Sequence, residues 1–323
     1  MSKHNPIRSA IIGAGMVGSV HAYAVHRAGG QLAAISASTP HSSELAAQRL
    51  GAERAATSED IFAADDVDVV HICTPNNLHL EQAAAALAAG KHVICEKPLA
   101  TTVADAQALV DAAHTAGTVA AVSFIYRFYP MAREARHRIA DSAVWLMHGG
   151  YVQDHQAKAD PTGWRSDPAQ SGVSMTFADI GSHWCDLAEF VTGHRITAVF
   201  AAEAAAPRGS IRQDDGAVVA FRTDRGAIGS VVVSQSSPGG LTNSSSAGSH
   251  PPRFCCVTQP SSTRVRRATR FCLPGIRRDT RTVSTRSSPT STTPSVPAPH
   301  PTVCRSLATD CGQQRFTPPL PPR

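Results

Sequence analysis

The residues best suited to acid–base chemistry lie together in segment 177–193. Asp179, His183 and Asp186 stand at positions i, i+4 and i+7, so a helix presents them on one face, opposite an apolar face. An imidazole with an ordinary pKa of about 6.5 accepts a proton near neutral pH, and a carboxylate one turn away can orient its ring. We therefore interpret Asp179 and His183 as a proton-accepting pair. A structural histidine is the alternative.

A glycine-rich turn near the N-terminus is the candidate anion-binding element. A short apolar run predicts a buried strand, and glycines follow it at the spacing G-x-G-x-x-G before a stretch with helical periodicity. The first glycine permits a sharp turn, the second allows a diphosphate to approach, and the third brings helix and strand together. The alternative is a tight turn with a structural role alone. The predicted dinucleotide contacts here are Gly13, Gly15, Met16, Val17 and Gly18.

The tip of the second predicted strand bears on the choice of cofactor. An acidic residue at this place favours NAD because it binds the ribose hydroxyl. The tip reads Ser36-Ala37-Ser38-Thr39, which contains no acidic residue and no arginine. Ser38 is the predicted contact, and the cofactor stays open between NAD and NADP.

Strands and helices alternate through the first 123 residues. This alternation predicts a doubly wound parallel sheet of the Rossmann type, with ligands outside the carboxyl ends of its strands. Two polar segments, Thr74–Asn77 and Glu96–Pro98, follow predicted strands and are therefore expected at that edge. The predicted strands are 10–12, 32–37, 68–73, 92–95 and 119–124.

Residues 124–237 predict a second domain of the α+β class. Its hairpin-rich strand pattern indicates a mostly antiparallel sheet. The irregular polar segment 153–170 has the composition of a loop that covers a substrate. Within it, Trp164 and Arg165 can stack on and hydrogen-bond to a polyol, or simply anchor the loop. The predicted helices are 131–139 and 177–193, and the predicted strands are 144–152, 196–203, 217–223 and 227–235.

Charge is distributed unevenly along the chain. Residues 238–323 hold 12 Arg, no Lys and two acidic residues, a net charge of +10, so residues 1–237 carry −5 of the total of +5. A nucleic-acid role inferred from the basic pI would therefore depend on the tail alone, and we expect no nucleic-acid partner. The chain opens without a signal peptide and has no apolar run long enough to span a membrane, so we expect a cytoplasmic protein.

Other catalytic classes find no support in the sequence. There is no C-x-x-C pair, H-E-x-x-H motif, Gly-x-Ser-x-Gly elbow or Walker lysine motif, and we expect no metal site. Cys73, Cys95 and Cys185 lie in apolar contexts and are interpreted as reduced core thiols.

Three motifs together resemble the glucose–fructose oxidoreductase / inositol dehydrogenase / MocA (Gfo/Idh/MocA) family over residues 8–237. They are Gly13-x-Gly15-x-x-Gly18, Thr74-Pro75-Asn76-x-x-His79 and Glu96-Lys97-Pro98, and segment 179–186 resembles the family's D-x-G-x-H-x-x-D signature. The segment 126–130 resembles the family's crossover, although a common Asn just before it is Ile125 here.

The resemblance implies a role for each of these motifs. It implies that Lys97 lies beside the nicotinamide and the substrate hydroxyl, and that Glu96 and the Thr74–His79 loop line the nicotinamide ribose. It also implies a homo-oligomer formed through the open face of the second sheet, if that sheet is complete. The candidate catalytic residues are thus Lys97, Asp179 and His183; candidate substrate contacts are Tyr126, Arg127, Trp164, Arg165 and Asp186; further cofactor contacts are Thr74, Pro75, Asn76, His79, Glu96 and Lys97.

The tail from residue 238 differs sharply from the rest of the chain. It holds 14 of the 22 prolines, has long Ser/Thr stretches and lacks apolar periodicity, which predicts disorder. Three readings stay open: a disordered tail, a mucin-like or interaction segment, and an out-of-frame translation, which we favour because the resemblance stops in mid-sheet. On that reading the second domain is truncated and its sheet has an exposed edge.

The hypothesis that follows is an NAD(P)-dependent oxidoreductase acting on a CH–OH group of a sugar or cyclic polyol. His183 would take the hydroxyl proton and Lys97 would stabilise charge on the substrate oxygen. The alternatives are a dinucleotide-binding sensor without turnover and an inactive frameshifted fragment of such an oxidoreductase.

Overall fold

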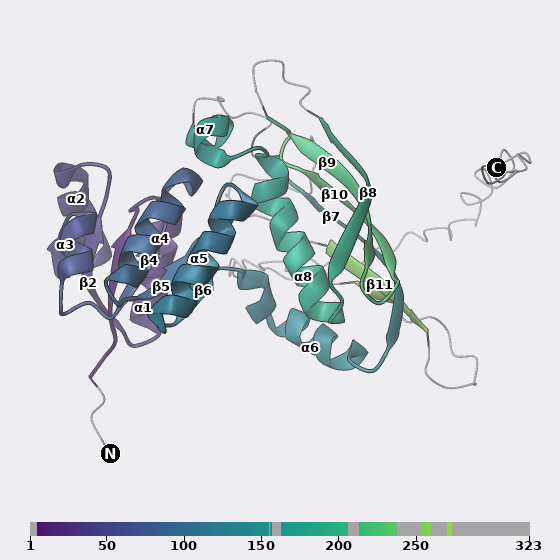
Figure 1. Ribbon diagram of the computed structural model, residues 1–323, viewed down its shortest axis with the longest axis horizontal. Coiled ribbons are helices and arrows are strands. Elements are labelled where there is room, and N and C mark those ends of the chain that lie inside the picture. The colour runs from purple at the N-terminus through teal and green to yellow at the C-terminus, as the bar shows by residue number, and fades with distance from the viewer. Residues whose placement is uncertain are drawn as a thin grey trace, which may run out of the picture. The chain divides into compact units, whose positions relative to one another are not determined.

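The first sheet of the computed structural model has the strand order expected of a doubly wound fold. The structure describes residues 5–154, 156, 163–205, 213–237, 253–259 and 270–272. In this part of the chain six parallel strands lie in the order β3-β2-β1-β4-β5-β6 (Figure 1). The elements are β1 (Arg8–Ile12), α1 (Met16–Arg27), β2 (Gln31–Ser36), α2 (Pro40–Leu50), β3 (Arg54–Ala55), α3 (Ser58–Ala63), β4 (Val69–Ile72), η1 (Asn76–Leu78), α4 (His79–Ala88), β5 (His92–Cys95), α5 (Val103–Ala116) and β6 (Ala120–Val122).

Alternating residues of β1 fill two separate cores. Ile11 packs with α1 and α2 on one face of the sheet, whereas Ala10 and Ile12 pack with α3, α4 and α5 on the other. Because both faces are covered, the strand is a continuous apolar run rather than an alternating one. Because all pairs of this sheet are parallel, the carboxyl ends of its strands lie at one edge.

The helix boundaries follow capping chemistry that the sequence displays. Thr39 accepts a hydrogen bond from the Ser42 backbone N–H at the start of α2, and Gly51 ends that helix with φ 72°. Gly117 ends α5 in the same left-handed conformation, with φ 65°. One predicted strand is shorter than expected: the strand predicted over 119–124 is β6 alone. The 3₁₀ turn η1 precedes α4.

The second sheet is mixed, with one parallel pair. Six strands of the described part lie in the order β12-β11-β7-β10-β9-β8; β10 runs parallel to β7 and the other pairs are antiparallel. Helices α6 and α8 pack on one face of it, and Trp184 and Phe221 meet edge to face in that core. The elements are η2 (Ile125–Phe128), α6 (Pro130–Ile139), β7 (Ala143–Val152), η3 (Trp164–Ser166), α7 (Pro168–Ser171), the π-helical turn η4 (Phe177–Gly181), α8 (Ser182–Thr192), β8 (Ile196–Ala205), β9 (Gly216–Thr223), β10 (Ile228–Ser234), β11 (Arg253–Gln259) and β12 (Arg270–Cys272).

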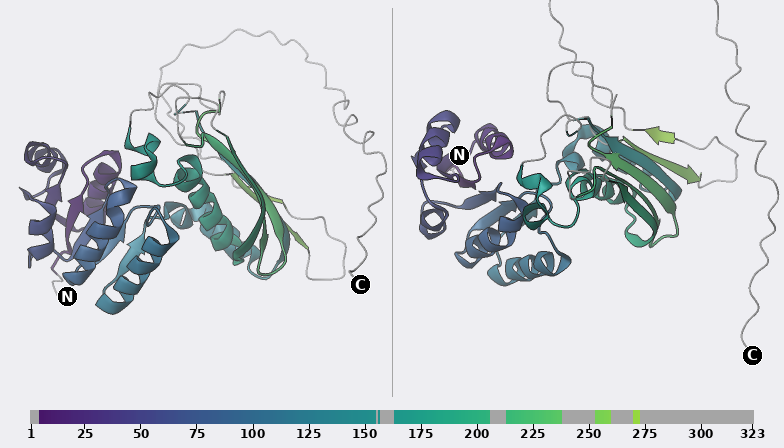
Figure 2. Two further views of the ribbon diagram at one scale, coloured as in Figure 1. Left: turned by 45° about the horizontal axis from the view of Figure 1, so that its top comes forward. Right: turned by 90° about the horizontal axis from the view of Figure 1, so that it is seen from above.

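Two segments of the predicted tail are strands of this sheet. β11 pairs with β7, and β12 pairs with β11, as the two views of Figure 2 illustrate. The last strand before residue 237, β10, lies inside the sheet between β7 and β9, and β11 and β12 extend the sheet on the far side of β7. The truncation of this domain, with its exposed sheet edge, stays a prediction. The rest of the predicted tail lies outside the described residues.

Residues Met1–Arg277 form one compact unit that contains both sheets, and the predicted boundary between residues 123 and 124 stays a prediction. Among the helices of the described residues, none combines the length and the apolar character needed to cross a membrane.

Candidate functional site

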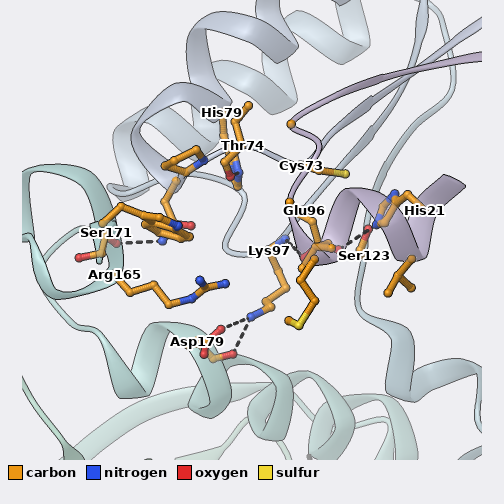
Figure 3. Close-up of a pocket in the computed structure, with 18 of the residues that line it drawn as sticks. His21, Cys73, Thr74, His79, Glu96, Lys97, Ser123, Arg165, Ser171 and Asp179 are labelled. Carbon is orange, nitrogen blue, oxygen red and sulfur yellow. Dashed lines mark hydrogen bonds and ion pairs between the residues drawn. The ribbon is translucent and has the colours of Figure 1, made fainter. Parts of the chain in front are cut away.

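A cavity of about 1910 Å³ lies along the carboxyl ends of the first sheet and extends to η4 and α8. Every predicted cofactor contact except Gly18 lines it, and so do the three candidate catalytic residues. Of the candidate substrate contacts, Tyr126, Trp164 and Arg165 line it. Figure 3 shows how Lys97 extends from one part of this cavity towards Asp179 on the other.

The three glycines of the turn have three different surroundings. A Cβ on Gly13, whose φ is 102°, would meet the Cys73 carbonyl carbon at 2.5 Å, and a Cβ on Gly18 would meet the Gly13 oxygen at 1.9 Å. Gly15, by contrast, has open space beside it. Gly13 and Gly18 therefore hold strand and helix together, while the open side of Gly15 leaves room for a phosphate group to approach. No side chain caps the start of α1, and Gly15, Met16 and Val17 line the cavity, so the first backbone N–H groups of this helix are available to an anion there.

The wall formed by β2 and α2 contains one charged side chain among its cavity-lining residues. Arg49 lies on the last turn of α2, and its Nη2 donates to the Ala14 carbonyl oxygen at 3.1 Å. The strand tip itself, residues 36–39, contains no arginine, and Arg49 is 11 positions beyond Ser38 in the chain. The fold brings it back to the glycine turn.

The Thr74–His79 loop lines the cavity, but its polar groups are engaged within the protein. Thr74 Oγ1 donates to Gln82 Oε1 at 2.7 Å, and Asn76 Nδ2 donates to the Ser171 carbonyl oxygen at 3.0 Å. His79 is fully buried, with its two ring nitrogens 2.9 and 3.0 Å from the carbonyl oxygens of Pro98 and Thr74. The side chains of this loop therefore hold it in place.

Lys97 and Asp179 form an ion pair across the cavity. Lys97 Nζ contacts the Asp179 carboxylate and donates to its backbone oxygen at 2.9 Å. Gln235 Nε2 donates to the other carboxylate oxygen at 2.6 Å. Burial alone raises the pKa of Asp179, but the Lys97 ammonium and these hydrogen bonds outweigh it and lower the pKa to about 2. The carboxylate is therefore charged at neutral pH.

His183 lines the same cavity without the expected carboxylate partner. Its Nδ1 is buried and has no hydrogen-bond partner among the described residues, while the rings of Phe124 and Tyr126 lie edge to face with it at 5.9 and 4.8 Å. The prediction that Asp179 orients this ring is thus corrected. Asp179 lies in the π-helical turn η4, and its carboxylate is held by Lys97 and Gln235 instead. Burial, with a smaller effect of Lys97, lowers the pKa of His183 to about 4, so the imidazole is neutral.

Asp186 and Arg127 do not line the cavity, contrary to the sequence prediction. Arg127 Nε donates to both carboxylate oxygens of the buried Asp186, at 2.9 and 2.8 Å. The Arg127 guanidinium also lies over the Phe190 ring, 5.5 Å from its centroid. The pair joins η2 to α8 and thereby supports the helix that carries His183.

The other three candidate substrate contacts have neighbours of their own. The Tyr126 hydroxyl is 2.7 Å from the Tyr151 hydroxyl, and the Arg165 guanidinium lies 4.4 Å from the Trp164 ring centroid. Sequence reasoning missed Tyr151, Gln235 and His21. No motif marks them, because each lies far along the chain from the site residue that it contacts. These contacts are His21 with Glu96, Tyr151 with Tyr126 and Gln235 with Asp179.

Comparisons with known proteins show the family to which the two matched regions of the chain belong. Residues 7–124 match the family described as "Oxidoreductase family, NAD-binding Rossmann fold", and residues 103–250 match "GFO/IDH/MocA C-terminal domain". A levoglucosan dehydrogenase of Pseudarthrobacter phenanthrenivorans is 33% identical over 231 residues, which are 64% of this chain and 59% of that protein. An inositol 2-dehydrogenase of Rhizobium meliloti is 30% identical over 199 residues, 61% of this chain and 58% of that protein. The chain therefore spans less than two thirds of the length of these relatives.

Solved structures show the same fold. An oxidoreductase domain protein from Kribbella flavida has a TM-score of 0.71 and 30% identity, covering 79% of this chain and 74% of that chain. A levoglucosan dehydrogenase in complex with NADH and L-sorbose has a TM-score of 0.70 and 27% identity, covering 83% and 79%. With its glycine turn, its Lys97 segment and both matched regions, the chain belongs to the Gfo/Idh/MocA family of oxidoreductases, and its N-terminal part is an NAD(P)-binding Rossmann domain.

Proposed function

We propose that this protein oxidises a CH–OH group of a sugar or cyclic polyol with NAD⁺ or NADP⁺. The observation that carries the proposal is that Lys97, Asp179 and His183 line the cavity that also contains the glycine turn. When bound, the nicotinamide would accept the hydride that leaves the carbinol carbon. Levoglucosan dehydrogenase and inositol 2-dehydrogenase, both relatives of this chain, carry names of the same substrate class.

His183 is the proposed acceptor of the hydroxyl proton. Its imidazole is neutral, so the ring can take a proton without first losing one. Because Nδ1 is buried, Nε2 is the nitrogen proposed to take it. The protonated ring would lie near the Asp179 carboxylate, which favours its charged form. This proton acceptor replaces the oriented Asp–His pair that the sequence suggested.

Lys97 is the proposed donor to the substrate oxygen. An ammonium carries three N–H donors, and Asp179 occupies part of this capacity through its carboxylate and backbone oxygen. A remaining donor can stabilise the negative charge that develops on the oxygen as hydride leaves. Trp164 and Arg165 offer a stacking surface and hydrogen bonds for the ring of a sugar.

At the adenosine end we propose that the site accepts the 2′-phosphate of NADP. Ser38 and Arg49 line the cavity there, and no acidic residue lines it among the described residues of β2 and α2. A phosphate therefore meets one positive charge and no negative one.

The outer face of the second sheet supports a further part of the proposal, a homo-oligomer. Large apolar side chains are exposed on it in the described structure, among them Trp145, Val199, Val218, Ile228 and Val232. Several large apolar side chains exposed on one face of a sheet are typical of a protein–protein interface. Sedimentation velocity on the full chain tests this: a monomer at all concentrations would contradict it.

Purified full-length chain, incubated with a panel of sugars and cyclic polyols and with each cofactor in turn, tests the activity. We expect a rise in reduced-nicotinamide absorbance with at least one substrate. Cofactor binding with no turnover of any substrate would instead favour a non-catalytic dinucleotide-binding protein. The Lys97→Met variant shows whether observed turnover belongs to this site.

A further inference from the structure

A buried cluster of two histidines and one carboxylate lies behind Lys97. His21 of α1 is 3.0 Å from His71 of β4, Nδ1 to Nδ1, and its Nε2 is 3.1 Å from Glu96 Oε1. The two imidazole rings meet edge to face at 5.2 Å and 88°. The His21 and Glu96 side chains are 12% and 15% exposed, and Figure 3 shows them side by side in the cavity wall.

Protonation of this cluster follows from its contacts. Burial, and to a lesser extent the neighbouring His21, lowers the pKa of His71 to about 4, so His71 is neutral. Glu96 is charged, because His21 and Lys97 outweigh the effect of burial and lower its pKa. A carboxylate only accepts hydrogen bonds, so His21 Nε2 carries a hydrogen and donates it to Glu96. One hydrogen lies between the two Nδ1 atoms, and either His21 or His71 can carry it.

The surrounding titratable groups do not compete for Glu96. Burial raises the pKa of the Cys73 and Cys95 thiols, and the Glu96 charge adds to this effect, so both thiols are protonated. The other contact of the carboxylate is the backbone: Lys97 N–H donates to Glu96 Oε2 at 3.2 Å. One carboxylate oxygen is thus held by His21, and the other holds the Lys97 backbone.

The Lys97 segment is tied down on its other side as well. The Pro98 carbonyl oxygen lies 2.9 Å from His79 Nδ1, and His79 is fully buried. The backbone that carries Lys97 thus lies between two imidazoles: His21 acts on one end through Glu96, and His79 lies against the other, where its single N–H reaches the Pro98 or the Thr74 carbonyl oxygen. From this backbone the Lys97 side chain reaches Asp179.

We propose that His21, backed by His71, is a positioning residue for Lys97. Through Glu96 it fixes the backbone from which the Lys97 ammonium is presented to the substrate oxygen and to Asp179. The effect on turnover rests on the proposed function, whereas the effect on Lys97 itself does not.

Two amide substitutions separate the two contacts of His21. In His21→Gln the side-chain amide can take the place of Nε2 and still donate to Glu96, whereas in His21→Asn it can take only the place of Nδ1. We expect His21→Asn to lower kcat about tenfold or more with KM changed less than about threefold, and His21→Gln to keep kcat within about threefold of the parent chain. His114→Ala, at an exposed position on α5, is the matched control.

A readout without substrate keeps the test independent of the proposed function. Acetic anhydride at limiting amount labels free amines, and mass spectrometry of the full chain quantifies acetylation of Lys97 against Lys91. We expect His21→Asn to raise the Lys97 fraction at least about threefold, because a less fixed amine spends more time free of Asp179. Equal kinetics and equal labelling of the Asn and Gln variants would overturn the proposal. A parent chain that oxidises no sugar would overturn the proposed function, and the labelling would still decide the role of His21.

Discussion

The Lys97 ammonium lies against the Asp179 carboxylate and backbone oxygen, and this contact joins the end of β5 to the π-helical turn η4. It links residues 82 positions apart in the chain. Lys97 and Gln235 engage the two carboxylate oxygens, so Asp179 makes no hydrogen bond to the His183 ring although its charge still acts on it.

Replacing Lys97 with Met tests whether its ammonium stabilises the negative charge that develops on the substrate oxygen. The variant keeps the length of the side chain but loses all of its donors, so we expect kcat/KM to fall by about 10²-fold or more. The dissociation constant for the reduced cofactor, measured by its fluorescence, should change much less. Lys91→Met is the matched control: Lys91 Nζ donates to the Ala64 carbonyl oxygen at 2.5 Å, and it does not line the cavity. Equal losses in both variants would remove the role assigned to Lys97.

The pH profile of kcat/KM tests His183 as the base. A base must be deprotonated to act, and because burial lowers the pKa of His183 to about 4, activity should rise as the pH passes upward through about 4 and then level off. An exposed histidine would place this rise near pH 6.5 instead. Tryptophan fluorescence at each pH shows whether the chain stays folded.

The matched variant is His183→Gln. Its kcat should fall by about 10²-fold or more, and the rise of activity at low pH should disappear. A rise centred near pH 6.5 that survives in His183→Gln would show that another group is the base.

The glycine turn predicts opposite effects at two glycines three positions apart. In Gly18→Ala the new Cβ has no room beside the Gly13 oxygen, so we expect the free energy of unfolding to fall by roughly 1–3 kcal/mol. In Gly15→Ala the Cβ meets no protein atom, so stability should change by less than about 0.5 kcal/mol. The Gly15 variant should nevertheless bind dinucleotide about tenfold or more weakly, because its methyl group occupies the phosphate side of the turn. Urea denaturation and cofactor titration give the two quantities, and a destabilised Gly15→Ala with unchanged binding would contradict this division.

Ala37→Asp tests the proposal that the adenosine end of the site accepts the 2′-phosphate of NADP. Ala37 lines the cavity directly after β2, and a carboxylate there would accept from the ribose hydroxyl of NAD and repel the 2′-phosphate of NADP. We expect the ratio of the dissociation constants, NADP over NAD, to increase by roughly tenfold or more. Gln48→Asp adds the same charge at an exposed position of α2 that does not line the cavity. If both variants shift the ratio equally, the effect is that of net charge alone.

The sequence by itself determined the local elements and the first sheet. The glycine spacing placed the turn between β1 and α1, Thr39 and Gly51 marked the ends of α2, and the strand–helix alternation specified a parallel sheet with Lys97 at its carboxyl edge. These features depend on backbone conformation and on patterns within a few residues, so they can be deduced from neighbouring residue types.

Only the tertiary structure decided which charged groups meet. On an ideal helix Asp179, His183 and Asp186 share a face, yet Asp179 pairs with Lys97 and Asp186 pairs with Arg127. His183 Nδ1 has no hydrogen-bond partner among the described residues. The bonds that hold Glu96 and Asp179 come from His21 and Gln235, which are remote in the chain. The free energy of an ion pair or a buried hydrogen bond depends on which groups the fold brings within about 3 Å, and that distance is set by packing across both sheets rather than by spacing along the sequence.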